Sequence, residues 1–204
     1  MAWPAASCQD PLFLRQILAA MGRPEVVEEV ALFDRDQCLV QLVLDRRGLR
    51  GSLPPEIGQF RRLRALSLSY NQLSGPIPAE LGQLRELEQL FLDYNQFSGP
   101  IPPELGQLGK LRGLFLDHNQ LSGSIPPELG RLSRLENLCL QDNQLSGSIP
   151  SQLGQLSSLK GLFFGSQPAF WAHSAPTGAT AQPGKSVPVG QSPQRTHTPR
   201  ASPA

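Results

Sequence analysis

Apolar and polar residues alternate along most of the chain in a pattern that repeats every 24 residues. Each full copy contains the same phrase, of which LRALSLSYNQLSGPIPAELGQL is the first example. One asparagine marks each of the four most similar copies: Asn71, Asn95, Asn119 and Asn143. A degenerate copy, LVQLVLDRRGLRGSLPPEIGQF, precedes them, and a shortened one, LKGLFFG, follows. A period of about 20 to 29 residues with this leucine spacing predicts a solenoid of stacked repeats.

Each copy opens with a predicted strand. In the second copy Leu66 and Leu68 point inward and Ser67 points outward, because successive side chains alternate across a strand. Strands of neighbouring copies are expected to pair in parallel, about 4.8 Å apart. The asparagine ends the strand, where its amide can donate to and accept from backbone groups that the turn leaves without partners. The four asparagines are therefore expected to form a buried, hydrogen-bonded column.

The second half of each copy carries the other two elements of the coil. In the LSGPIP or LSGSIP phrase the isoleucine points inward, and the proline ends the segment without needing a donor. The following E-L-G-x-L phrase predicts a short helical or 3-10 turn on the convex side. We expect its glycine, such as Gly82, to stop the turn. Its glutamate, such as Glu80, falls near the start of the turn, where the helix dipole favours a negative charge.

These phrases resemble the plant-type leucine-rich repeats of receptor-like kinase ectodomains and polygalacturonase-inhibiting proteins. The L-x-G-x-I-P phrase and the 24-residue period carry the resemblance, which covers about residues 39–164. It implies that the L-x-G-x-I-P stretch forms a second short sheet, and that the protein binds a protein or peptide and is not an enzyme. The predicted fold class is thus an α/β repeat solenoid: a leucine-rich repeat arc with a parallel concave β-sheet and short helical or 3-10 turns on the convex side.

The predicted N-terminal cap comprises residues 1–38. Asp10 and Pro11 mark a helix start, Gly22 marks its end, and a second helix start lies at Pro24. A hairpin follows, with a turn at 34–37 and a strand from Cys38. One face of the first helix is apolar and would cover the open end of the solenoid: Leu14, Ile17, Leu18 and Met21. We interpret the paired cysteines and the tryptophan usual in the resembled caps as missing, which makes this an atypical cap.

The solenoid is predicted over residues 39–165, with about five full copies and a truncated one, and a tail over 166–204. The tail holds seven prolines, three basic residues and no acid, so it buries too little apolar surface to offset chain entropy. We expect it to be disordered, apart from Phe170 and Trp171, which are placed to fold back over the truncated copy.

Composition narrows the functional class. A formal net charge of +1 argues against a nucleic-acid partner, and no apolar run approaches the roughly 20 residues of a membrane span. No phosphate-binding glycine loop or metal-ligand spacing occurs, so no cofactor and no metal are predicted. His118 with Asp93, Asp117 and Asp142 could form a weak metal or acid–base cluster, but an open sheet offers no desolvated pocket for catalysis. The chain is therefore predicted to be a non-enzymatic monomer that binds a protein or peptide.

The outward strand positions form columns on the concave face, which is where solenoids usually bind partners. One column contains phenylalanines, the next contains aspartates, and the third contains tyrosines and a histidine. The candidate partner-binding residues are Phe91, Phe115, Phe163, Asp93, Asp117, Tyr70, Tyr94 and His118. Rigid aromatic side chains suit an interface, and the flanking acids suit a basic group on the ligand. The alternative is that ring stacking between strands only stabilises the sheet.

A further column alternates in charge and is assigned to structure, as a ladder that fixes the register of similar copies: Arg64, Glu88, Arg112, Glu136 and Lys160.

The compartment is predicted from three features. The sequence shows no signal segment and no glycosylation acceptor, and its three cysteines are expected to be unpaired. These observations favour the cytoplasm, or a secreted or membrane-bound location if the N-terminus is misassigned. Two other functions stay open: a fragment of a leucine-rich repeat receptor-like kinase or of a secreted inhibitor of cell-wall enzymes, with missing ends, and a passive scaffold.

Overall fold

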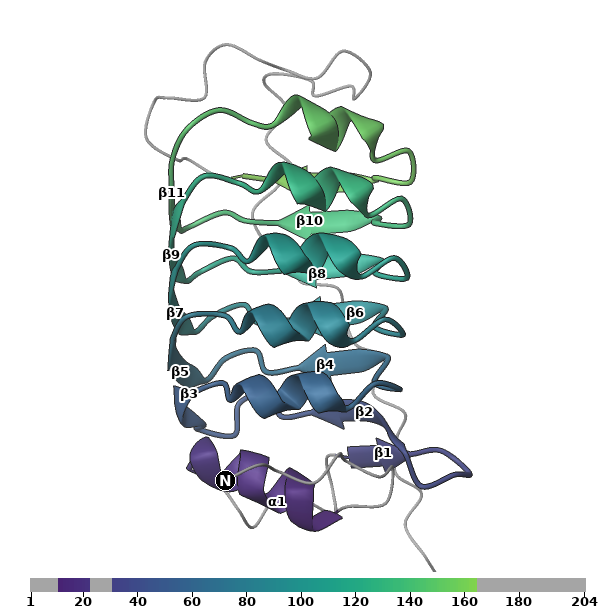
Figure 1. Cartoon of the computed structure of the whole chain (residues 1–204). Helices are drawn as coiled ribbons and strands as arrows, with labels where there is room; N and C mark the ends of the chain where they lie inside the picture. Colours follow the sequence, from purple (N-terminus) through teal and green to yellow (C-terminus); the bar gives the residue numbers. More distant parts are fainter. Residues whose placement is uncertain (1–10, 23–30, 165–204) are drawn as a thin grey trace, which may run out of the picture.

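The structure is a computed structural model that describes residues 11–22 and 31–164 (Figure 1). The described residues form a stack of coils above one α-helix, α1 (Pro11–Ala20). The seven strands of the larger sheet follow one another up the stack: β1 (Ala31–Phe33), β2 (Leu39–Val43), β4 (Ala65–Ser67), β6 (Gln89–Phe91), β8 (Gly113–Phe115), β10 (Asn137–Cys139) and β12 (Gly161–Phe163). The repeat solenoid predicted from the sequence is confirmed.

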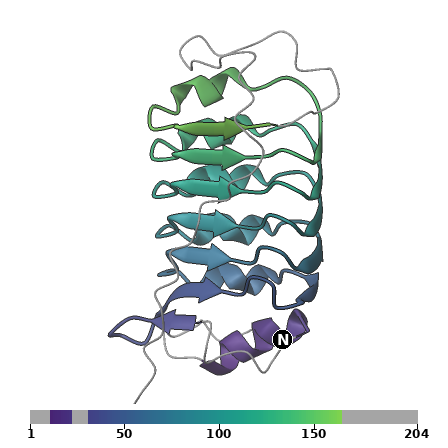
Figure 2. The ribbon, with the colours of Figure 1, turned by 180° about the vertical axis from the view of Figure 1, so that it is seen from behind.

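The larger sheet has the register that a 24-residue repeat requires. Leu66 pairs with Leu90, and Leu90 pairs with Leu114, so equivalent leucines stack from copy to copy. The exception is β1, which is antiparallel to β2 and closes the sheet with the predicted hairpin. Figure 2 shows this sheet on one side of the stack and the helical turns behind it.

A second parallel sheet is formed by the phrase that contains LSG. Its five strands run along one flank of the stack: β3 (Arg50–Ser52), β5 (Gln72–Gly75), β7 (Gln96–Gly99), β9 (Gln120–Gly123) and β11 (Gln144–Leu145). The glycine that ends a strand such as β5 has a positive φ, +80° at Gly75, which a side chain would disfavour. This sheet, which the family resemblance implied, is present.

Five 3-10 turns cover the convex side: η1 (Pro55–Gln59), η2 (Ala79–Gln83), η3 (Pro103–Gln107), η4 (Pro127–Arg131) and η5 (Ser151–Gln155). The prediction that glycine stops each turn is wrong. Gly82 lies inside η2, and the turn ends at Gln83, followed by the C-cap residue Leu84. A Cβ on Gly82 would lie 2.5 Å from the carbonyl oxygen of Glu104 in the next turn. The glycine is therefore needed because successive turns approach each other too closely for a side chain.

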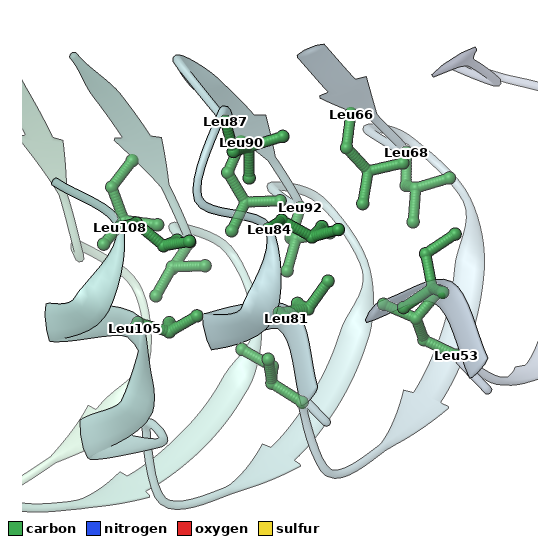
Figure 3. Packing of buried hydrophobic residues seen from close by; sticks show 14 of the residues in the cluster. Leu53, Leu66, Leu68, Leu81, Leu84, Leu87, Leu90, Leu92, Leu105 and Leu108 are labelled. Atoms are coloured by element: carbon green, nitrogen blue, oxygen red, sulfur yellow. The ribbon is translucent and has the colours of Figure 1, made fainter. Parts of the chain in front are cut away.

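The core is one continuous ladder of leucines between the sheet and the turns. Leu81, Leu84, Leu90 and Leu92 are fully buried, and their equivalents in the next copies stack on them (Figure 3). Each copy leaves its apolar side open and is covered by its neighbours, as expected for a solenoid.

The asparagine column joins neighbouring copies through the backbone. Asn95 donates to the carbonyl oxygens of Leu92 in its own copy and Leu68 in the preceding one, at 3.2 and 2.9 Å, and accepts from the Leu73 N–H at 3.0 Å. Asn71 and Asn119 have equivalent bonds and are equally buried. Asn143 keeps these bonds but is only half-buried, because the copy that follows it is truncated.

The cap follows the sequence prediction with one correction. The four apolar residues expected on one face of α1 are buried against the first copy, and the Met21 carbonyl accepts from the Arg50 N–H at 3.0 Å. However, Cys38 is disulfide-bonded, so the prediction that all three cysteines are unpaired is wrong. Sequence alone did not reveal this, because widely separated cysteines carry no pairing signal. The predicted Asp10 cap, the second helix at Pro24, the tail disorder and the Phe170–Trp171 lid lie outside the described residues.

Candidate partner-binding face

The outward side of the larger sheet is called the concave face below. Three rows of side chains cross it, each at one position of the repeat. The phenylalanine row comprises Ser67, Phe91, Phe115, Cys139 and Phe163; the acid row comprises Asp45, Ser69, Asp93, Asp117 and Gln141; the turn row comprises Arg46, Tyr70, Tyr94, His118 and Asp142. The structure thus brings all eight sequence-predicted binding residues onto one surface.

The phenylalanine row is a partial ring stack. The Phe91 and Phe115 rings are stacked, with centroids 4.6 Å apart and planes at 10°. Phe163 is separated from them by Cys139 and is 43% exposed. Phe115 lies over Gly113, where a Cβ would lie 2.7 Å from the ring. Cys139 is buried, and burial raises the pKa of its thiol to about 12, so the thiol is neutral and unreactive.

Serine hydroxyls donate hydrogen bonds to the first two carboxylates of the acid row. The Ser67 hydroxyl donates to Asp45 Oδ1 at 2.5 Å, and the Ser69 hydroxyl donates to Asp93 Oδ1 at 2.5 Å. Both serines are almost fully buried, although strand alternation places them on the outward side. The sequence missed this pairing because the two carboxylates come from the copies before and after the serines.

Asp117 is the buried carboxylate of the row, with a side chain only 10% exposed. Burial is the main cause that raises its pKa to about 6, and the neighbouring charge of Asp93 adds to the effect. Asp142 acts in the same direction, whereas His118 and a backbone N–H oppose it. Asp117 is therefore ionised at neutral pH at a free-energy cost that an exposed aspartate does not have.

The turn row is a continuous stack of planar groups. The Arg46 guanidinium lies 4.4 Å from the centroid of Tyr70, Tyr70 stacks on Tyr94 at 4.2 Å, and Tyr94 stacks on His118 at 4.0 Å. These residues have left-handed backbones, with φ from 51° to 57°. Residues other than glycine disfavour this left-handed region of backbone conformation. The sequence placed the row beside the acids but did not reveal the stacking or the backbone conformation.

His118 connects the turn row to two carboxylates. Its Nε2 lies 3.3 Å from Asp142 Oδ2 and 3.9 Å from Asp117 Oδ2. Asp142 is well exposed, with a side-chain exposure of 57%. Among the described residues no other cationic side chain lies within ion-pair distance of these two carboxylates.

The charge ladder predicted on a neighbouring column is largely formed. Arg112 lies 3.0 Å from Glu136 and 4.0 Å from Glu88, and Lys160 lies 2.7 Å from Glu136. The hydrogen bond from Lys160 is the main cause that lowers the pKa of Glu136. These pairs are largely exposed and stabilise the stack little individually.

The described residues contain neither a metal-ion cluster nor a membrane-spanning helix. No three or more His, Cys, Asp or Glu side chains are grouped so as to hold a metal ion in this part of the chain. No helix within residues 11–22 and 31–164 is both long and apolar enough to span a membrane.

A parallel sheet, a flanking sheet and stacked 3-10 turns define a repeat solenoid. Its concave face carries rows of side chains from equivalent positions of the repeat. A profile described as Leucine Rich Repeat matches residues 62–84, 86–108, 110–132 and 134–156. The chain belongs to the leucine-rich repeat family, and its repeats are of the plant type.

Solved structures extend the comparison. The ectodomain of the receptor kinase SOBIR1 from Arabidopsis thaliana is 31% identical, with a TM-score of 0.69 and coverage of 81% of this chain and 96% of that one. The ectodomain of the Arabidopsis receptor kinase GASSHO1/SCHENGEN3, in complex with CASPARIAN STRIP INTEGRITY FACTOR 2, is 43% identical with a TM-score of 0.58. The plant peptide hormone receptor RGFR1, in complex with RGF2, is 35% identical with a TM-score of 0.61.

The chain is short beside two of these proteins. The match covers 59% of this chain but 14% of the GASSHO1/SCHENGEN3 chain, and 63% of this chain but 21% of the RGFR1 chain. No curated protein sequence matches it significantly.

Proposed function

We propose that this protein is a non-enzymatic module that binds a peptide or protein through its concave face. The observation that carries the proposal is the combination of rings and carboxylates on that face. Leucines already fill the core, so the phenylalanine and turn rows are not needed to exclude water from it. Rigid rings beside acidic side chains offer both contact area and charge to a ligand.

The likeness to ligand-bound receptors supports the same function. RGFR1 is described as a peptide hormone receptor, and it shares 35% of residues with the matched part of this chain. A shared fold alone does not assign a function. The proposal therefore depends on the side chains of the concave face, and its test must change those side chains.

The test replaces Phe91 and Phe115 with serine in one variant. Serine occurs at the equivalent position, Ser67, and is accommodated there within the sheet. Proteins or peptides retained by the immobilised wild type from an extract of the source tissue are quantified by mass spectrometry, and each is confirmed with purified material. We expect the double variant to lose the confirmed partner.

The matched control carries the same number of new serines on the flanking sheet, at Gln72 and Gln96, which are exposed. Circular dichroism must show that both variants keep the wild-type spectrum. Retention of the partner by a folded Phe91→Ser/Phe115→Ser variant would remove the concave face as the binding surface.

The second candidate function is the ligand- or partner-binding part of a receptor-like kinase, or a secreted inhibitor. Two observations favour it: the match covers nearly all of the SOBIR1 ectodomain, and Cys38 is disulfide-bonded. Disulfides persist in oxidising compartments and are rare in the cytosol. The cytoplasmic location predicted from the sequence depended partly on unpaired cysteines, so the disulfide favours an oxidising compartment instead.

Thiol counting on protein isolated from the source tissue distinguishes these locations. The tissue is lysed in a denaturant with a thiol-blocking reagent and no reductant, and the added mass is measured on the intact protein. A cytoplasmic protein would be blocked at all three cysteines. A protein from an oxidising compartment should be blocked at fewer than three cysteines, and blocking of all three would refute that location.

A further inference from the structure

The turn row already contains an example of how this face holds a cation. At its first position the Arg46 guanidinium lies over the Tyr70 ring, 4.4 Å from its centroid. A guanidinium prefers such a place because the face of the ring attracts its charge.

The opposite end of the same stack has the ring and the carboxylates without an arginine. His118 is the last planar group, and Asp117 and Asp142 lie within 4 Å of its Nε2. Tyr70, Tyr94 and His118 hold their rings at nearly equal spacings, and the next position of the turn row is the carboxylate of Asp142 instead of a ring.

A neighbouring acceptor adds to this arrangement. Gln141 precedes Asp142 in the chain and lies beside Asp117 across the sheet, where the His118 N–H donates to the Gln141 carbonyl at 3.0 Å. Its side-chain oxygen is buried and has no hydrogen-bond partner in the described part of the chain. Buried acceptors without donors are rare and costly, so Gln141 adds a local free-energy cost at this end of the stack.

We propose that the concave face anchors a basic peptide by stacking one of its arginine side chains on His118, beside Asp117 and Asp142. This assignment rests on the proposed function and specifies its ligand chemistry. A guanidinium fits better than an ammonium because it is planar and has five N–H donors that two carboxylates can accept.

The test compares three blocked tetrapeptides that differ only in the third residue: arginine, citrulline or lysine. Citrulline has nearly the shape of arginine without its charge, so the comparison isolates the electrostatic contribution to the binding affinity. Binding is followed through the backbone amide shifts of Tyr94, His118 and Asp142 in nuclear magnetic resonance titrations. We expect the arginine peptide to bind at least about fivefold more tightly than the citrulline peptide, with lysine between them.

A charge-matched pair of variants locates the contact. Asp142→Asn should weaken the arginine peptide roughly three- to tenfold and leave the citrulline peptide unchanged. Glu104→Gln removes the same charge from the convex turn η3 and should alter neither. Citrulline is used with both variants, so a general loss of folding is distinguished from loss of the ion pair.

Three outcomes would overturn the inference: equal affinity for arginine and citrulline, shifts confined to the convex or flanking surfaces, or no binding of the arginine peptide. Equal binding of both peptides on the concave face leaves the proposed function in place. Partner capture that survives the Phe91→Ser/Phe115→Ser change removes the proposed function itself.

Discussion

Replacing Asp117 with asparagine should make the protein more stable at neutral pH. The carboxylate is nine-tenths buried and its pKa rises from 3.8 to about 6, mainly through desolvation. A shift of one pKa unit corresponds to about 1.4 kcal/mol, so ionised Asp117 destabilises the folded state by up to about 3 kcal/mol. Asparagine has the same shape and no charge, and the neighbouring copy has an amide, Gln141, at the equivalent position.

The pH dependence follows from the direction of the shift. The folded state binds the proton of Asp117 more tightly than the unfolded state, so this group lowers the stability as the pH rises from about 4 to about 6. Above pH 6 the full penalty is present, and below pH 4 both states are protonated and it disappears. The stability gained by Asp117→Asn should therefore be about 1–3 kcal/mol at pH 7.5 and close to zero at pH 4.

Urea unfolding followed by circular dichroism, at pH 4, 5, 6 and 7.5, measures this difference for the two proteins side by side. Asp142→Asn serves as the control, because it makes the same charge change at an exposed side chain and should alter stability by less than about 0.5 kcal/mol. An Asp117→Asn protein that is no more stable than wild type at pH 7.5, or one whose gain is independent of pH, would refute the reasoning.

Two further predictions concern the coil itself. Asn95→Ala should lower the free energy of unfolding by about 2–4 kcal/mol because buried backbone groups lose partners. Asn143→Ala should cost less, since Asn143 is half-buried, and equal losses in urea unfolding would contradict this ordering. Gly82→Ala should cost about 1–3 kcal/mol because its Cβ meets Glu104. Gly109→Ala has open space around it and should not destabilise; thermal unfolding of both variants tests the contrast.

The solenoid could be predicted from the sequence because its signal is local and repeated. Leu66 and Leu90 occupy equivalent positions in copies 24 residues apart, and the structure pairs them directly. In a repeat protein each copy contacts mainly its neighbours, so the period of the sequence fixes the register of the sheet. The same reasoning identified the rows of the concave face, since outward positions follow from strand alternation.

Properties that depend on spacing between copies could not be predicted in this way. Gly82 was interpreted from its own turn, whereas its role depends on the backbone of the next turn at Glu104. Asp117 appeared to be an exposed outward residue, but the surrounding rows bury it. The disulfide at Cys38 gave no signal because sequence separation does not report spatial proximity.

Some side chains of the concave face are not the ones that would make the sheet most stable, so substitutions there can change stability and binding in opposite directions. The second copy shows that serines serve the sheet well: Ser67 and Ser69 are buried and hydrogen-bonded. The fourth copy instead has Phe115 and a desolvated Asp117, and the desolvation of Asp117 has a free-energy cost. Local costs of this kind concentrate at functional sites. Asp117→Asn should therefore gain stability and lose affinity for the arginine peptide together, whereas a purely structural aspartate would change stability alone.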